Sequence, residues 1–177
     1  EHTQEFDYTE TEAYAKTIEE TFNEAGDLIV MEGKVSIKHK YVLDEKGWLG
    51  ISQTETLTAT ADAYYEFTTP LNRADIEVKG TKIIVTIKAP SLKKEATHRI
   101  ANTMHVIEDE TDSSFFSTKE NARKAVRYWE DTYMKRANDR IADLYRKDDL
   151  NKEAIKQVEE LVKHLTGNNK IEIRVEG

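Results

Sequence analysis

Five histidines are the residues of this sequence best suited to metal binding or proton transfer. They are His2, His39, His98, His105 and His164. A zinc site needs three or four converging ligands, often two of them one helical turn apart. Only His98 and His105 are close in the sequence, and they lie in a polar segment without a clear period. We therefore expect scattered surface or half-buried histidines and no metal ligands.

Carboxylates are the second group that could do chemistry. A pair of acids can hydrolyse a glycosidic bond, but abundant acids in an acidic chain do not identify such a pair. The run Glu108–Asp112 could bind calcium, yet it lacks the central glycine and the terminal glutamate of an EF-hand loop. We expect an acidic turn there. A hydrolase whose carboxylates or histidines converge only in the fold remains the alternative function.

Other catalytic signatures are missing from the sequence. It has no cysteine, no G-x-S-x-G elbow and no glycine-rich phosphate loop. The aromatic residues Tyr128, Trp129, Tyr133 and Tyr145 could line a ligand groove, but aromatic side chains at helical spacing more often pack in a core. The sequence thus predicts no catalytic residue, no cofactor-binding residue and no metal ligand, and no cofactor.

The element expected to organise the fold is a helix from Ser117 to about Lys147. This stretch has no glycine or proline, and its apolar residues recur mostly three or four positions apart. Ser117 and Glu120 have the spacing of a capping box. Trp129 is expected to be buried between this helix and a sheet.

The other elements follow from changes of period along the chain. We expect a frayed leader at 1–8 and an acidic helix at 9–25, with Gly26 as its stop. Alternating residues predict strands at 35–41, 51–68, 74–78, 82–88, 104–107 and 170–176, with turns at 44–47 and 79–81. A second helix is expected at 151–166, ending before Gly167. The last strand is expected to pair beside 82–88.

These elements predict an α+β fold in a single domain, 1–177. A mostly antiparallel sheet packs against the one long helix and the shorter C-terminal helix. No apolar run approaches eighteen residues, and no signal peptide is visible. The first residue is Glu1 rather than methionine, which indicates a trimmed or mature form, from which an upstream anchor or signal could have been removed.

The distribution of charge and the absence of cysteine limit the classes of partner and the cellular location that we expect. Residues 1–32 hold ten acids and one base, and the rest of the chain holds 24 acids and 25 bases. This distribution disfavours a nucleic-acid partner, which needs clustered lysine and arginine. The absence of cysteine excludes disulfides and fits a bacterial protein exported from the cytoplasm.

Four stretches carry a resemblance to a known family. They are Thr11–Tyr41, ADIEVKGTKIIVTIKAP at Ala74–Pro90, ARKAVRYWEDTYMKRANDRIADLY from Ala122, and the closing helix and strand. Together they resemble a family of bacterial proteins catalogued only as a domain of unknown function. The resemblance implies an N-terminal membrane anchor and a soluble part outside the cytoplasm, and it supplies no catalytic residues.

The expected function is therefore a non-enzymatic, extracytoplasmic binding or assembly domain of a membrane-anchored bacterial protein. Its partner would be a protein or small molecule of unknown identity, not a nucleic acid. Contact with the membrane would come only through an anchor outside this sequence.

Overall fold

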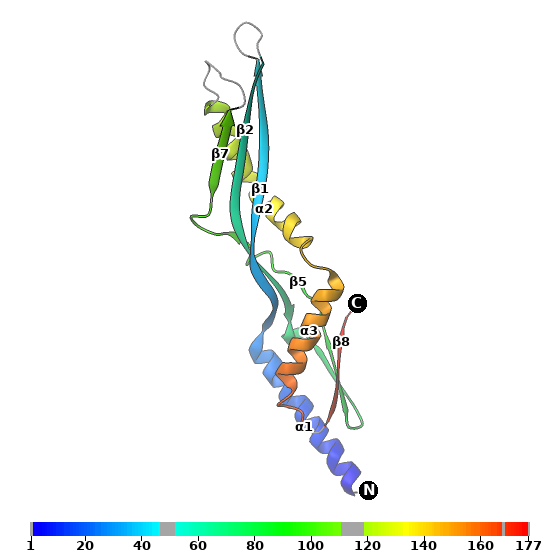
Figure 1. Ribbon diagram of the computed structural model, residues 1–177. Helices are drawn as coiled ribbons and strands as arrows, with labels where there is room; N and C mark the ends of the chain where they lie inside the picture. Colours follow the sequence, from blue (N-terminus) through cyan, green and yellow to red (C-terminus); the bar gives the residue numbers. More distant parts are fainter. Residues whose placement is uncertain (1, 47–51, 111–118, 168, 177) are drawn as a thin grey trace. The chain divides into compact units, whose positions relative to one another are not determined.

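The structure is a computed structural model that describes the backbone of residues 2–46, 52–110, 119–167 and 169–176 (Figure 1). Side chains are described for 10–41, 56–106, 123–167 and 169–176. The elements in chain order are α1 (His2–Ala25), β1 (Asp27–Lys46), β2 (Ser52–Pro70), η2 (Leu71–Arg73), β3 (Asp75–Lys79), β4 (Lys82–Ile87), β5 (Ser91–Leu92), β6 (His98–Arg99), β7 (His105–Glu110), α2 (Lys119–Ala142), α3 (Lys147–Val162) and β8 (Lys170–Val175).

The predicted α+β class is confirmed, with the strands distributed over two sheets. One sheet has the order β1-β2-β5, and β6 and β7 also pair with β2. The other has the order β3-β4-β8. Among the described residues, no helix is both long and apolar enough to cross a membrane.

The chain divides into two compact units. Unit 1 comprises Glu1–Glu32, Glu66–Lys93 and Tyr145–Gly177, and unit 2 comprises Gly33–Tyr65 and Lys94–Leu144. Strands β1 and β2 contribute 27–32 and 66–70 to unit 1 and their remaining residues to unit 2. That the whole chain is a single domain stays a prediction.

The three-stranded sheet of unit 1 follows the predicted strand pattern closely. Strands β3 and β4 form an antiparallel hairpin whose turn contains Gly80 at φ +61°, a conformation that glycine adopts without steric cost. Strand β8 pairs with β4 in parallel, with Ile173 opposite Val85. This is the predicted partner of the C-terminal strand, and β4 is central because it is hydrogen-bonded on both sides.

Two helices cover one face of this sheet. Helix α1 contacts η2, β3 and β4, and α3 contacts β8. The core between helices and sheet is built from side chains on alternating strand positions and on the inner helix faces. Its fully or largely buried members include Ile18, Phe22, Ile83, Val85, Ile87, Val158 and Val162. Burial of this apolar area is the main force that holds unit 1 together.

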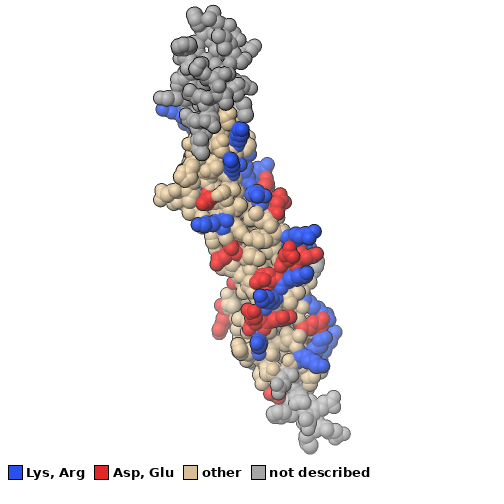
Figure 2. Space-filling view, in the orientation of Figure 1, with Lys and Arg blue, Asp and Glu red and all other residues tan. Residues whose placement is uncertain are grey.

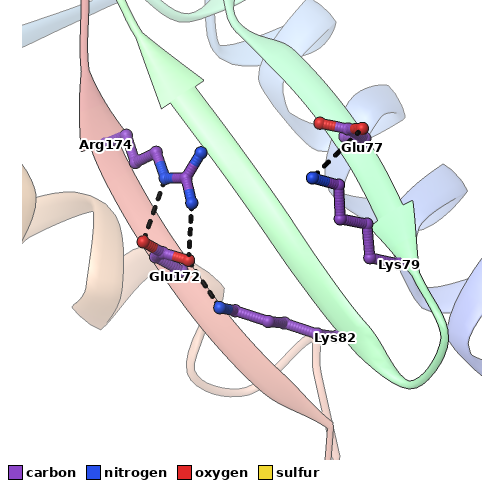
Figure 3. A network of polar contacts seen from close by, with 5 residues as sticks. All are labelled: Glu77, Lys79, Lys82, Glu172 and Arg174. Carbon is purple, nitrogen blue, oxygen red and sulfur yellow. Dashed lines mark hydrogen bonds and ion pairs between the residues drawn. The ribbon is translucent and has the colours of Figure 1, made fainter.

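The opposite face of the same sheet carries charge. Glu77, Lys79, Lys82, Glu172 and Arg174 lie on the side away from the helices (Figure 3). Ile84 also falls on this face by strand alternation, opposite Glu77 on one side and Glu172 on the other, and it is only 3% exposed. The aliphatic parts of long charged side chains can provide such cover.

In unit 2, β2 is the central strand. It pairs antiparallel with β7, with Thr58 opposite Ile107, and with β6, with Ala63 opposite Arg99. Its buried face alternates strictly with its other face and is made of small residues over much of its length: Leu57, Ala59, Ala61, Ala63 and Tyr65. Small side chains leave room for large rings from an element packed above.

Helix α2 supplies those rings. Ala125, Trp129, Tyr133, Ala137 and Ile141 form its buried face. Trp129 is fully buried, as predicted, and its ring centroid lies 5.1 Å from that of Tyr133 in an edge-to-face arrangement. The Tyr133 hydroxyl donates to the backbone carbonyl of Ala61 at 3.1 Å. Burial raises the pKa of Tyr133 to about 12, against the opposing effect of the Arg99 charge.

Several predicted boundaries were wrong. The residues predicted as a frayed leader are helical, since α1 begins at His2 and ends at Ala25 before Gly26. Helix α2 ends at Ala142 rather than near Lys147. Helix α3 runs from Lys147 to Val162 rather than from 151 to 166, with Asp148 and Asp149 in its first turn, where acids are stabilised by the helix dipole.

The strand predictions also needed correction. Strand β1 begins at Asp27 and passes through Gly33, whereas the predicted strand began at 35. The acidic run predicted as a turn continues β7 as far as Glu110, and its later residues lie outside the described residues. Gly47 of the predicted turn at 44–47 and the Ser117 capping position lie outside them too.

Candidate binding site

The most developed polar cluster of unit 2 is built on three residues of α2 spaced by four: Tyr128, Thr132 and Arg136. Residues four apart lie on one face of a helix. The Thr132 hydroxyl donates to the backbone carbonyl of Tyr128 at 2.9 Å, and the same oxygen accepts from Nε of Arg136 at 3.2 Å. The helix therefore holds the guanidinium of Arg136 from one side.

His39 of β1 holds the guanidinium from the other side. Nη1 of Arg136 lies 2.9 Å from Nδ1 of His39. Arginine can only donate, so Nδ1 accepts and the remaining proton of neutral His39 is on Nε2. Burial lowers the pKa of His39, and the adjacent positive charge of Arg136 lowers it further. The imidazole is thereby kept neutral, and its outer nitrogen is a donor.

Two tyrosines form an aromatic wall beside these groups. The ring of Tyr41 meets His39 at 4.3 Å between centroids and Tyr128 at 6.5 Å, both edge to face. Tyr128 is 56% exposed, whereas the hydroxyl oxygen of Tyr41 is buried and has no hydrogen-bond partner among the described residues. Burial raises the pKa of Tyr41, so its hydroxyl is protonated at neutral pH. We call Tyr41, His39, Tyr128, Thr132 and Arg136 the Arg136 cluster.

The charge of Arg136 is not neutralised by any carboxylate in the described part of the chain. A guanidinium has five N–H groups. Thr132 and His39 each accept from one of them, and both acceptors are uncharged. The other three N–H groups of this half-buried cation therefore have no acceptor among the described residues.

The histidines do not come together as a metal site. His98 places Nδ1 2.8 Å from the carbonyl oxygen of Ala96 and packs its ring at 5.3 Å from Tyr64. His105 and His164 are exposed, and the side chain of His2 is outside the described residues. No group of three or more histidine, aspartate or glutamate residues in the described part of the chain could hold a metal ion.

The carboxyl group with the most strongly shifted pKa, that of Glu172, is not part of a general acid–base pair. Glu172 accepts from Nε of Arg174 at 2.9 Å and pairs with Lys82 at 2.6 Å on the open face of the unit 1 sheet (Figure 3). Hydrogen bonds from Arg174 and Lys82 lower its pKa to about 2. A general acid requires the opposite shift.

The four aromatic residues considered from the sequence do not line one groove. Trp129 and Tyr133 are core residues of unit 2, and Tyr128 is exposed beside Tyr41. Tyr145 belongs to unit 1, where its ring packs edge to face against Phe67 at 5.5 Å. The packing interpretation therefore holds for Trp129, Tyr133 and Tyr145, while Tyr128 is exposed.

A concave surface lies in unit 1 at the end of α3. It has a volume of about 450 Å³ and is lined by Lys156, Glu159, Glu160, Val162, Lys163, Thr166, Gly167 and Ile171. Its charged lining consists of two lysines and two glutamates, so acids and bases are balanced there. Figure 2 shows the same intermingling of acidic and basic side chains over the face that carries α3.

The sequence analysis did not identify the Arg136 cluster, although three of its five residues have a recognisable helical spacing. The spacing of Tyr128, Thr132 and Arg136 is a helical pattern that the sequence displays. The contact with His39 spans 97 residues and depends on which face of β1 meets α2. Searches against protein-family models, curated proteins and solved structures found no match to this chain.

Proposed function

We propose that this chain is a non-enzymatic binding or assembly domain, and that the Arg136 cluster is its contact surface for a partner. In the full-length protein the domain would lie outside the cytoplasm of a bacterium, held to the membrane by an anchor. The family resemblance and the lack of cysteine support that location.

The observation that carries the proposal is that α2 presents the immobilised guanidinium of Arg136 and, two turns earlier, the exposed ring of Tyr128, with Tyr41 between Tyr128 and His39. Tyrosine and arginine are the side chains most enriched among residues that dominate binding energy. The cluster is also pre-organised, since Thr132 and His39 fix the guanidinium before any partner arrives. Less side-chain entropy is then lost on binding.

A hydrolytic function has weaker support from the described residues. The strongly shifted carboxyl group, Glu172, is held ionised by two cations on an open sheet face. The Arg136 cluster contains no carboxylate, and its histidine accepts from an arginine rather than from a nucleophile. These groups suit recognition better than proton transfer.

A photo-crosslinking residue placed at position 128 of the full-length protein tests the contact surface in living cells. Position 130 is the matched control, because Glu130 is also exposed on α2 but lies on the other side of its buried face. We expect discrete adducts from position 128 at least about ten times as abundant as those from position 130. Equal yields from the two positions would contradict the proposal.

The proposed location has a separate test. Protease added to intact spheroplasts should degrade a domain that lies outside the cytoplasmic membrane and leave a cytoplasmic marker protein whole. Degradation only after the membrane is broken would place the domain inside.

A further inference from the structure

The free N–H groups of Arg136 point to the class of group that its partner presents. We propose that the Arg136 cluster binds a carboxylate, supplied by an acidic side chain of a protein partner. This inference rests on the proposed function, because it names the chemistry of the partner at the same surface.

The donor inventory of the cluster supports an anionic ligand. Within the described ranges, no residue accepts from either N–H group of Nη2 or from the second N–H group of Nη1 in Arg136, and neutral His39 carries its proton on Nε2. Thr132 has already used its hydroxyl proton on the carbonyl of Tyr128. The unused polar groups of Arg136 and His39 are thus all donors, and a ligand that satisfies them must supply acceptors.

The charge balance favours a carboxylate over a phosphate. A carboxylate carries one negative charge and pairs with a guanidinium through two parallel hydrogen bonds. A phosphate group carries about 1.5 to 2 negative charges near neutral pH and would leave charge uncompensated beside a single cation. Among the described residues, the charged and titratable side chains in contact with His39 are Arg136 and Tyr41, and Arg136 supplies the charge there.

The surroundings favour an acidic side chain of a protein. The exposed ring of Tyr128 lies two helical turns before Arg136 and contacts Tyr41, which in turn contacts His39. A protein that places an acidic side chain on Arg136 can therefore pack a neighbouring apolar side chain on Tyr128, which a small carboxylate cannot do. The half-buried position of Arg136 strengthens the contact relative to a fully exposed ion pair.

The test uses propionate as the probe and the Nε–H signal of Arg136 as the reporter, measured by NMR on the full chain. We expect a saturable shift with a dissociation constant of roughly tens of millimolar, the strength of one charge-assisted contact. Sodium chloride at matched ionic strength should give no saturable shift. A response to propionate no different from that to chloride would mean that water alone occupies the site, and it would overturn the inference.

A second reporter separates binding at the site from binding elsewhere. A carboxylate on Arg136 offsets the positive charge that depresses the pKa of His39, so that pKa should rise on saturation with propionate. The Arg136→Lys variant keeps the charge but loses the planar fork, and it should bind propionate at least five-fold more weakly. Unchanged affinity in this variant would contradict the assignment.

Two further measurements test whether the ligand is a carboxylate and whether Thr132 positions Arg136. Methylphosphonate should compete no better than propionate, and tighter binding of the phosphonate would overturn the choice of a carboxylate. Thr132→Val removes the acceptor that positions Nε and should weaken propionate binding while the circular dichroism spectrum is preserved. Adducts from position 128 that persist in Arg136→Gln, without propionate binding to the wild type, would leave the proposed function standing and remove this inference.

Discussion

Replacement of Trp129 by alanine tests the packing of unit 2 most sharply. The side chain is fully buried, and its ring contacts Tyr133 edge to face at 5.1 Å. Truncating a buried tryptophan to alanine costs about 3–5 kcal/mol. This is a large part of the roughly 5–15 kcal/mol by which a domain is stable. Trp129→Ala should therefore shift unfolding to a much lower urea concentration.

A second substitution at the same position separates ring packing from hydrogen bonding. Nε1 of Trp129 is buried and has no partner among the described residues. Leaving such a donor unpaired costs about 1–3 kcal/mol in the native state. Trp129→Phe removes this donor and keeps an aromatic ring, so its net cost should be only about 1 kcal/mol. The loss of unfolding free energy should therefore be several times larger for Trp129→Ala than for Trp129→Phe.

The assay is urea unfolding followed by far-ultraviolet circular dichroism, with Tyr128→Ala as the control. Tyr128 is the neighbouring residue on the same helix and is 56% exposed, so its truncation should change stability by less than about 0.5 kcal/mol. Trp129 should also show blue-shifted fluorescence in a Trp48→Phe background. A solvent-like emission maximum, or equal costs for Trp129→Ala and Tyr128→Ala, would refute the placement of α2 on its sheet.

Four other outcomes are expected. Gly33→Ala should destabilise by about 1–3 kcal/mol, because its new Cβ would lie 2.7 Å from the hydroxyl of Tyr65, and Tyr65→Phe should reduce that cost in a double-mutant cycle. Removal of 170–177 should lower the melting temperature and promote aggregation on gel filtration, since it exposes the edge of β4; an unchanged, monodisperse protein would show that β8 is dispensable. Glu172 has a pKa lowered to about 2 from 4.5, so its contribution to stability is present above pH 4.5 and is lost as the pH falls toward 2; Glu172→Gln should flatten this part of the stability curve, and an unchanged slope would argue against the ion pairs. A chelator should leave the melting temperature unchanged, and a drop of several degrees would reveal a structural metal.

The unit 1 sheet was predictable from the sequence because its information is local. Ile83, Val85 and Ile87 alternate along one strand, and Ile171 and Ile173 alternate along another, so each strand displays its buried face. Gly80 marks the turn between β3 and β4 in the same way. Pairing of the two most apolar strands then follows from the need to bury both.

The boundaries that failed depend on information from elsewhere in the chain. The predicted strand began after Gly33, at 35, but β1 continues through Gly33. The ring of Tyr65 occupies the space where a side chain at position 33 would lie. Asp148 and Asp149 fell between the two predicted helices, although acids stabilise the first turn of a helix and here belong to that of α3. In both cases one local pattern fits two structures, and tertiary packing selects between them.

The candidate site was hidden for a similar reason. Arg136 is one of several basic residues on α2, and nothing in its sequence neighbours distinguishes it. What sets it apart is its pairing with a neutral histidine 97 residues away and with a hydroxyl that is itself held by the helix backbone. A helical wheel could propose the Tyr128–Thr132–Arg136 face, but only the fold places His39 on it.

The most direct measurement is the yield of crosslinked adduct from position 128 in cells, compared between the wild-type sequence and Arg136→Gln. The chain should form a discrete adduct with a partner protein in the first case. The yield should fall by about ten-fold in the second, because loss of a charge-assisted contact of roughly 1.5–3 kcal/mol weakens binding by that order. An adduct of equal yield in both proteins would remove Arg136 from the recognition of the partner, and no adduct in either protein would contradict the cluster as a contact surface.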